Sequence, residues 1–313
     1  MPNSSVIHAC TVDVEDYYQV SAFDHVFPRD RWDDVPERIT ASTERVLELL
    51  DDAGVRGTFF ILGRVADRCP NLIRRIAAAG HEMGCHSHDH RLVHALSKAE
   101  FREDLRRAKG RIEDLAGSAV AAYRAPSFSI VSQSLWALEV LADEGFEFDS
   151  SVYPIFHDRY GIADAPHAPY RIESPSAGLT EFPPTTMGFL GRRVPAAGGG
   201  YFRLYPYWLT AHAIRRVEAN GLPANLYVHP WEFDPDQPEV AGIAFGRRFR
   251  HRVGLRKTAI KFARLLRDFR FGTLTEALAT VPPLPTYEVV GDRLVPIARP
   301  RIAPSALVEA GAS

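Results

Sequence analysis

Residues 57–90, GTFFILGRVADRCPNLIRRIAAAGHEMGCHSHDH, contain the pattern that decides the fold class. GTFFIL (57–62) is a short apolar run typical of a buried strand. NLIRRIAAAG (71–80) has the apolar spacing of a helix that ends at Gly80. HEMGC (81–85) then predicts a second short strand. A strand, a helix and a strand in this order indicate a parallel sheet with helices packed outside it.

The same alternation extends to both sides of this stretch. VIHACTV (6–12) predicts a first strand, and Ser97 with Glu100 opens a long helix at 97–116 as a capping box. The pattern fits a barrel or an open doubly wound sheet, although the first strand lacks the glycine-rich fingerprint of a dinucleotide-binding sheet. In both folds the functional site lies at the carboxyl ends of the strands. Further strands are predicted at 121–124, 146–150 and 224–229, and further helices at 36–53, 132–145, 207–220 and 255–270.

The 313-residue chain has an ordinary globular composition, with 46% hydrophobic and 24% charged residues. Its 37 basic and 39 acidic residues give a formal net charge of -2, which argues against a nucleic-acid-binding protein. No apolar stretch approaches the ~18 residues that span a bilayer, and the first residues lack the features of a secretion signal. We therefore expect a cytoplasmic protein. The basic amphipathic helix at 255–270 permits peripheral contact with a membrane without establishing it.

The three cysteines, Cys10, Cys69 and Cys85, are an odd number at unrelated spacings. This pattern favours reduced thiols over a disulfide framework. Cys85 directly precedes a histidine cluster, but we expect it to be a small buried strand residue rather than a metal ligand.

Polar side chains gather at the ends of four predicted strands. Carboxylates, imidazoles and a guanidinium delivered to one rim are what a metal-dependent hydrolase needs. These residues also have purely structural interpretations. The acidic run at 13–16 could be a solvated turn or a helix cap, and His229 could be a core histidine. His86 and His90 have the i,i+4 spacing that suits zinc on a helical turn, but with twelve histidines in the chain the spacing alone is weak. The residues are Asp13, Glu15, Asp16, His86, His88, His90, Arg124 and His229.

Together these stretches resemble the polysaccharide deacetylase family, also called the NodB-homology domain or carbohydrate esterase family 4. The resemblance rests on four stretches in the family's order: GTFFILG (57–63), AGHEMGCHSHDH (79–90), YRAPSF (123–128) and LYVHP (226–230). It implies a distorted (β/α)7-type barrel. It also implies a metal-dependent hydrolase that removes N-acetyl groups from the amino sugars of a glycan, with zinc as the metal and cobalt or manganese as alternatives.

More narrowly, the chain is similar to the exosortase-associated deacetylases, which carry a C-terminal region of unknown function. TVDVEDYY (11–18), FDSSVYPIFHDRYG (148–161), AGGGYFRL (197–204) and VHPWEFDPDQP (228–238) have this likeness. It implies a role in bacterial exopolysaccharide production, with an N-acetylated glycan substrate and contact with the exopolysaccharide machinery. The sequence leaves the oligomeric state open.

The expected domain organisation is a single barrel, followed by a Pro- and Ala-rich tail that we expect to be loosely held. The expected ranges are 1–281 for the barrel, with insertions at about 151–205 and a C-terminal region at about 232–281, and 282–313 for the tail.

The resemblance assigns a role to most of the polar residues at the strand ends. The family's first motif has two adjacent aspartates, a base and a metal ligand, whereas here Val14 separates Asp13 from Glu15. Because Asp13 and Glu15 project to the same side of an extended chain, Asp13 is expected as the base and Glu15 as the ligand, with Asp16 as the alternative ligand. His86 and His90 complete the expected ligand set.

The remaining roles concern the substrate. Metal-bound water is expected to attack the acetamide, with Arg124 orienting the base, the Ser127 N–H stabilising the oxyanion and His229 protonating the amine. The family has tyrosine where this chain has Ser127, but only the backbone N–H is needed. The family's charge partner for the acid histidine has no clear counterpart near Tyr153. Phe128, Tyr201 and Trp231 are candidate walls for a sugar ring.

Two other functions fit parts of this pattern. The first is an amidohydrolase acting on a small cyclic amide or ureide, because the same barrel resembles some allantoinases. The second is a non-catalytic glycan-binding protein on the same scaffold, which the presence of a base, two histidines, an arginine and an acid histidine disfavours.

Overall fold

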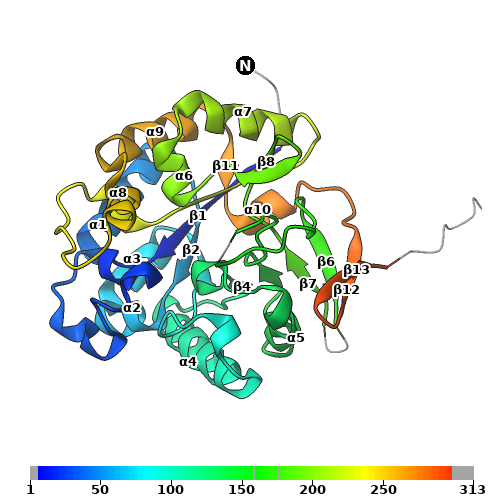
Figure 1. The fold of residues 1–313 in the computed structure, drawn as a ribbon, viewed down its shortest axis with the longest axis horizontal. Helices are drawn as coiled ribbons and strands as arrows, with labels where there is room; N and C mark the ends of the chain where they lie inside the picture. The colour runs from blue at the N-terminus through cyan, green and yellow to red at the C-terminus, as the bar shows by residue number, and fades with distance from the viewer. Residues whose placement is uncertain (1–5, 158, 175–176, 298–313) are drawn as a thin grey trace, which may run out of the picture.

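The computed structural model describes residues 6–157, 159–174 and 177–297, and its centre is a mainly parallel sheet surrounded by helices (Figure 1). Consecutive parallel neighbours run in the order β10-β1-β2-β3-β4-β5-β7. This confirms the predicted α/β class. The strands of this parallel part are β1 (His8–Val14), β2 (Thr58–Ile61), β3 (Glu82–Cys85), β4 (Ala122–Tyr123), β5 (Phe148–Asp149), β7 (Leu179–Glu181) and β10 (Asn225–Val228).

Strands β10 and β7 form the two edges of this parallel part, and among the described residues they do not pair with each other. The chain that follows β7 reaches β10, where the Thr185 N–H donates to the Asn225 carbonyl oxygen at 3.2 Å. The Asn225 N–H in turn donates to Thr185 Oγ1 at 2.7 Å. The sheet is therefore curved like a barrel whose last seam is made by a loop.

Helices between the strands cover the outside of the sheet (Figure 1). The predicted helices are present, and α4 begins with the predicted capping box between Ser97 and Glu100. Short helices such as α2 were not predicted, because a single turn or two carries too little periodicity to be recognised. The helices are α1 (Ile39–Asp52), α2 (Gly63–Arg68), α3 (Pro70–Ala78), α4 (Lys98–Ala116), α5 (Trp136–Asp143), α6 (Gly199–Leu204), α7 (Tyr207–Glu218), α8 (Phe245–Arg252), α9 (Leu255–Asp268) and α10 (Leu274–Leu278).

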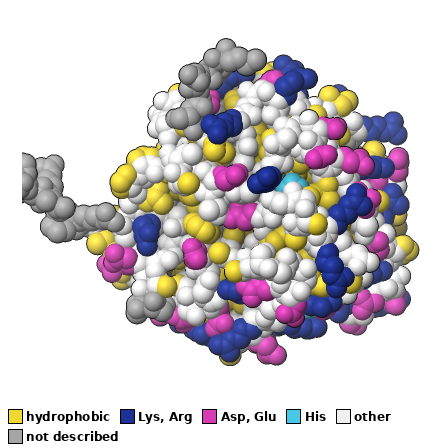
Figure 2. Space-filling model, turned by 180° about the vertical axis from the view of Figure 1, so that it is seen from behind, with side chains coloured by type: hydrophobic (Ala, Val, Ile, Leu, Met, Phe, Trp, Pro, Cys, Tyr) yellow, Lys and Arg dark blue, Asp and Glu magenta, His cyan; other side chains and the backbone are white. Residues whose placement is uncertain are grey.

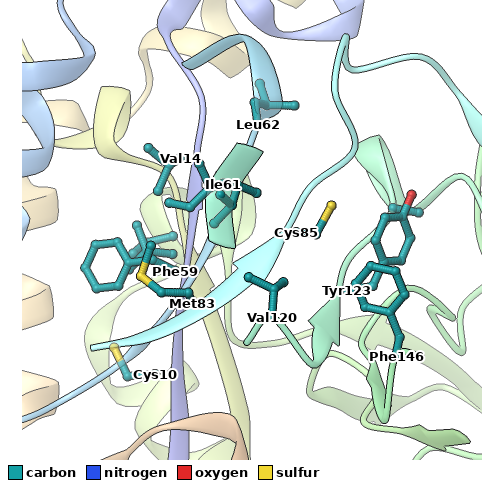
Figure 3. Packing of buried hydrophobic residues seen from close by; sticks show 14 of the residues in the cluster. Cys10, Val14, Phe59, Ile61, Leu62, Met83, Cys85, Val120, Tyr123 and Phe146 are labelled. Atoms are coloured by element: carbon teal, nitrogen blue, oxygen red, sulfur yellow. The ribbon is translucent and has the colours of Figure 1, made fainter. Parts of the chain in front are cut away.

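The main hydrophobic core lies between the sheet and its helices. Cys10 on β1 and Cys85 on β3 are buried in it, beside Phe59 and Met83 (Figure 3). Burial raises the pKa of the Cys10 thiol to about 12 and raises that of Cys85 as well, so neither cysteine is a thiolate. The expectation that Cys85 is a buried strand residue is confirmed.

A smaller apolar cluster fills the amino-terminal end of the barrel. Ala9, Phe60 and Ala122 from three strands pack there with Phe182 and with Leu274 of α10. The Leu274 N–H also donates to Thr58 Oγ1 at the start of β2. Because this end is closed by apolar side chains, the polar interior is left to the carboxyl ends of the strands.

Three further strands extend the sheet beyond β7. Strand β6 (Tyr170–Glu173) lies antiparallel to β7, and the hairpin of β12 (Thr286–Val290) and β13 (Arg293–Pro296) pairs with β6. The expectation of a loosely held tail is therefore wrong for these residues, because β12 finds its partner more than a hundred residues earlier. Residues 298–313 lie outside the described residues. The other strands are β8 (Thr186–Phe189), β9 (Arg192–Pro195) and β11 (Phe271–Gly272).

The surface in Figure 2 mixes acidic and basic side chains among apolar ones. This mixture is expected for a chain whose basic and acidic residues nearly balance. None of the helices formed by the described residues combines the length and apolarity needed to cross a membrane.

Candidate active site and metal centre

Four strand ends deliver polar side chains to one buried site. Asp13 lies near the end of β1, His86 directly follows β3, Arg124 follows β4 and His229 follows β10. The Nε2 atom of His229 lies 3.8 Å from Asp13 Oδ2 and 3.7 Å from Glu15 Oε1. The predicted convergence of these residues from distant parts of the chain is thus present.

Glu15, His86 and His90 form a group with the composition of a metal site. One ligand atom from each lies within 4.8 Å of the others, and all three residues are buried. His90 Nε2 is 2.8 Å from Glu15 Oε2, and His86 Nε2 is 4.0 Å from the same oxygen. One carboxylate and two imidazoles fit a zinc-like divalent cation.

The electrostatics of the group favour the ligand forms of Glu15 and His86. Burial alone would raise the pKa of Glu15, but His90, His229 and His86 lower it to about 2, so the carboxylate is ionised. Burial lowers the pKa of His86 to about 4. A neutral imidazole and an ionised carboxylate are the forms that bind metals.

Backbone contacts orient His86 toward the other members. Its Nδ1 atom lies 2.7 Å from the Arg124 carbonyl oxygen. Since a carbonyl oxygen can only accept, Nδ1 carries the hydrogen, and the lone pair of Nε2 faces Glu15. This is the arrangement that fixes the tautomer of metal-binding histidines.

The alternative prediction, that Asp16 is a metal ligand, is wrong. Its Oδ1 accepts the Tyr17 N–H at 2.8 Å, and its Oδ2 accepts the N–H groups of Arg38 and Ile39 at 2.7 and 3.0 Å. Asp16 therefore caps the first turn of α1 from a distant part of the chain, and it is not part of the metal-site group. Its carboxylate is occupied by backbone donors.

Arg124 holds Asp13 in one orientation. The guanidinium Nη1 donates to Asp13 Oδ1 at 2.6 Å and to Thr11 Oγ1 at 2.8 Å. Nη2 donates to Ser150 Oγ at 2.8 Å, and the whole side chain is buried. Asp13 Oδ2 is left facing His229, so the carboxylate presents one oxygen to the site.

Glu232 is the charge partner of His229, and it is not among the site residues predicted from the sequence. Its Oε2 lies 3.2 Å from His229 Nδ1 and also accepts the His229 N–H at 3.0 Å. Burial lowers the pKa of His229, but Glu232, Glu15 and Asp13 raise it to about 9. The family resemblance implies a partner near Tyr153, whereas Glu232 stands three residues after the histidine. The H-x-x-E spacing at 229–232 was the available signal.

Arg203 holds Glu232 from the other side. Arg203 Nε donates to Glu232 Oε1 at 2.7 Å, and its Nη1 donates to the carbonyl oxygens of His251 and Val253. Both Arg203 and Glu232 are buried. Gly198, directly before α6, allows the close approach of this segment to β10, because a Cβ there would lie 2.1 Å from the Tyr227 ring.

The prediction that Trp231 forms an open wall for a sugar ring is also wrong. It is only 6% exposed and stacks between His229 and His251, with ring centroids at 5.4 and 4.4 Å. Its Nε1–H donates to Glu15 Oε1 at 3.3 Å. The indole therefore contacts both the candidate acid and a candidate ligand from inside the protein.

The other two predicted walls differ in exposure. Phe128 is 7% exposed and packs against Tyr153 and Tyr227 at centroid distances of 4.9 and 5.0 Å. Tyr201 on α6 is half-buried, 5.9 Å from the Tyr205 ring. Tyr201 thus keeps more of its surface available than Phe128 does.

The two loops around the site contain backbone strain. Ser87, His90, Ser127 and Phe128 have φ between 52° and 65°, and they are four of the five described non-glycine residues with positive φ. Such conformations are uncommon and persist where the surroundings enforce them. Here Ser21 Oγ lies 2.9 Å from Ser127 Oγ and 3.4 Å from His90 Nδ1, which ties the two loops together.

Comparison with known families divides the chain in two. Residues 31–146 match the family described as Polysaccharide deacetylase. Residues 150–279 match a separate family, described as a domain of unknown function (DUF3473). The deacetylase match contains His86, His90 and Arg124, whereas His229 falls in the second match.

Individual relatives agree with the deacetylase family. A peptidoglycan-N-acetylglucosamine deacetylase of Bacillus cereus is 34% identical over 98 residues, which are 31% of this chain and 36% of that protein. A chitooligosaccharide deacetylase of Bradyrhizobium sp. is 32% identical over 101 residues, 32% of this chain and 43% of that protein. The chain thus matches less than half the length of these curated relatives.

The deacetylase fold extends across nearly the whole chain. A solved structure from Mycobacterium smegmatis, described as a putative polysaccharide deacetylase, superposes with a TM-score of 0.57 at 21% identity. It covers 91% of this chain and 94% of that one. Both family matches therefore lie within one known fold, and the predicted single barrel at 1–281 stays a prediction about domain organisation.

Proposed function

We propose that this chain is a metal-dependent deacetylase that removes N-acetyl groups from the amino sugars of a bacterial exopolysaccharide. The observation that carries the proposal is one arrangement of charges. An Arg124-bound Asp13 carboxylate and a Glu232-bound His229 imidazole lie beside the Glu15, His86 and His90 group. A base, an acid and a metal-site group within one buried site are what amide hydrolysis needs.

Glu15, His86 and His90 would hold the metal, for which zinc is the first choice and cobalt or manganese are alternatives. When bound, such a cation supplies a Lewis acid that lowers the pKa of water from about 15.7 to about 7. His86 needs no rearrangement for this role, because its Nδ1–H donates to the Arg124 carbonyl oxygen and its Nε2 is left for the metal.

The chain's own residues move the protons. Asp13 accepts a proton from the attacking water at Oδ2, since Arg124 occupies Oδ1. The Ser127 N–H stabilises the negative oxygen that develops on the acetyl carbonyl. His229 donates its Nε2 proton to the amide nitrogen as the C–N bond breaks, which leaves acetate and a free amine on the sugar.

The substrate proposal rests on resemblance and on the names of relatives. Both curated relatives described above are named for N-acetylglucosamine-containing glycans or chitooligosaccharides. The motifs at 148–161, 197–204 and 228–238 resemble the exosortase-associated subgroup, which supports an exopolysaccharide as the natural substrate.

The test is acetate release from N-acetylglucosamine oligosaccharides by the full chain, with and without a chelator. We expect release that stops with the chelator and returns with added zinc. A parallel assay with allantoin separates the deacetylase from a cyclic amidohydrolase. Glycan binding without acetate release by metal-loaded protein would contradict the proposal and favour a non-catalytic binding protein.

A further inference from the structure

The chain's positive charge is concentrated in one segment. Residues 245–268, which contain α8 and α9, hold nine Lys or Arg and one acidic residue. The other 289 residues hold 28 basic and 38 acidic residues, so the small net charge of the whole chain conceals a strong local asymmetry. A local basic excess of this kind attracts anionic partners.

The outward side chains of α9 combine this charge with an apolar residue. Arg256, Lys257, Arg264 and Arg267 are exposed, and Ile260, which is 72% exposed, lies among them at helical spacing. The opposite side of α9 contributes to the protein core. The exposed side of the helix is therefore both basic and apolar.

Exposed apolar side chains also surround α9. Phe245 and Phe249 on α8, Leu204 at the end of α6 and Trp208 at the start of α7 are each more than half exposed. With Ile260, they make up half of the ten large exposed hydrophobic residues in the described chain. We call this surface the basic apolar face: Leu204, Trp208, Phe245, Arg247, Arg248, Phe249, Arg250, Arg256, Lys257, Ile260 and Arg264.

Hydrogen bonds and a cation–ring contact place these helices side by side. Lys261 Nζ on α9 donates to the carbonyl oxygens of Phe202 and Arg203 on α6. The Arg264 guanidinium lies 3.9 Å from the Tyr207 ring centroid on α7. A hollow of about 670 Å³ is lined by Leu204, Arg256 and Lys257. Figure 1 accordingly shows α6, α7, α8 and α9 grouped in one part of the molecule.

Several cations of this face have no carboxylate partner. Within the described ranges, Arg248, Arg250, Arg256 and Lys257 have no carboxylate oxygen within 4.0 Å. Arg102 on α4, by contrast, is paired with both Asp143 and Glu144. The unpaired cations are available to anions outside the protein.

We infer that the basic apolar face binds the surface of an anionic lipid bilayer. Arginines and lysines meet lipid phosphates, while exposed aromatic and aliphatic side chains enter the interface, and this combination is typical of peripheral membrane binding. A soluble polyanion would satisfy the charges but would leave Leu204, Trp208 and Ile260 in water. The apolar half of the surface therefore favours a bilayer.

The face also adjoins the candidate active site. His251 of α8 stacks on Trp231 at 4.4 Å and packs against Phe23 at 4.8 Å. Arg247 Nη1 lies 3.5 Å from the Ala22 carbonyl oxygen, next to Ser21. If the proposed function holds, membrane binding brings the site to glycans carried at the bilayer surface; the binding itself does not depend on that function.

The test is co-sedimentation of the full chain with vesicles of phosphatidylcholine alone or mixed with phosphatidylglycerol. We expect binding to the anionic vesicles only, weakened by salt because ions screen the attraction. Arg256→Ala with Lys257→Ala should weaken binding about 30-fold, since each cation near the surface contributes about fivefold. Phe245→Ser with Phe249→Ser should weaken it about tenfold or more while keeping the charge.

Matched controls lie on the β8–β9 hairpin. Phe189→Ser with Leu190→Ser removes equally exposed apolar residues, and Arg192→Ala removes an exposed cation there. These controls should bind vesicles like the wild type. Unchanged melting temperatures in all variants establish that the proteins are folded.

Three results would overturn the inference. They are no binding to anionic vesicles at low salt, equal binding by the variants of the basic apolar face and their controls, and binding only to a soluble acidic polysaccharide. Acetate release from soluble oligosaccharides, measured in the same variants, should stay at the wild-type rate. Vesicle binding without any acetate release in the wild type would sink the proposed function and leave the membrane inference intact.

Discussion

The two parts of the chain contribute to the site in different ways. Residues 8–149 supply Asp13, Glu15 and the histidines of the metal-site group from the ends of neighbouring parallel strands. Residues 150–279 supply His229, whose partner Glu232 is held by Arg203 of α6. The positions of the site residues in the first part therefore follow from the order of the strands. The positions of those in the second part depend on how helices pack around the end of one strand.

The difference also concerns charge. In the first part, a buried cation, Arg124, contacts a carboxylate that faces the site, and the imidazole of His86 is neutral. In the second part, buried Glu232 contacts His229, and the net effect of its surroundings raises the pKa of that imidazole. In the proposed function, one part accepts a proton and holds a cation, and the other part donates a proton.

Removing a member of the metal-site group should have the largest effect. His90→Ala leaves Glu15 and His86 without the third ligand, so we expect loss of stoichiometric metal and acetate release at the assay background. Metal content per chain, measured by elemental analysis, checks this. His94→Ala, four residues further on and outside the metal-site group, is the matched control. A full complement of metal in His90→Ala would remove it from the ligand set.

Asp13→Asn tests the base within the same part of the chain. The amide keeps the size of the side chain but cannot take the proton, so we expect kcat to fall about 10²- to 10⁴-fold. Metal content should stay stoichiometric, which separates this variant from His90→Ala. A rate near that of the wild type would exclude Asp13 as the base.

Glu232→Gln tests the second part of the site. We expect kcat to fall about 10- to 100-fold with little change in KM, because the imidazole loses a charged partner but keeps a similar neighbour. The metal should stay bound. An equal fall in Asp13→Asn and Glu232→Gln would erase the proposed contrast between the two parts. Glu239→Gln, an exposed glutamate of the same region, serves as the control.

Trp231→Phe should have the smallest effect. It removes the donor to Glu15 Oε1 but keeps a ring between His229 and His251. The loss of one hydrogen bond to a charged group should weaken metal affinity about tenfold. Competition with a chelator of known affinity measures this, and Trp208→Phe at an exposed position is the control. Unchanged affinity would mean that the indole N–H does not orient Glu15.

The local pattern of the sequence was enough to place most of the site. Alternating strands and helices predicted a parallel sheet, and polar residues directly after its strands predicted where Asp13, His86, Arg124 and His229 meet. This works because parallel strands end on one rim, so the residue after each strand is positioned by the backbone. The capping box at Ser97 could also be predicted from the sequence, because all its contacts lie within one helical turn.

Only the tertiary structure decided the roles of residues whose partners are distant in the chain. Asp16 caps α1, Glu232 is fixed by Arg203, and Trp231 is enclosed by His229 and His251. The groups that fix Asp16 on α1 and enclose Trp231 include Ile39 and His251, which stand far from them in the sequence, so no local pattern identifies these contacts. The orientation of a side chain is set by the groups that pack against it, and those groups come from elements that the sequence pattern cannot bring together.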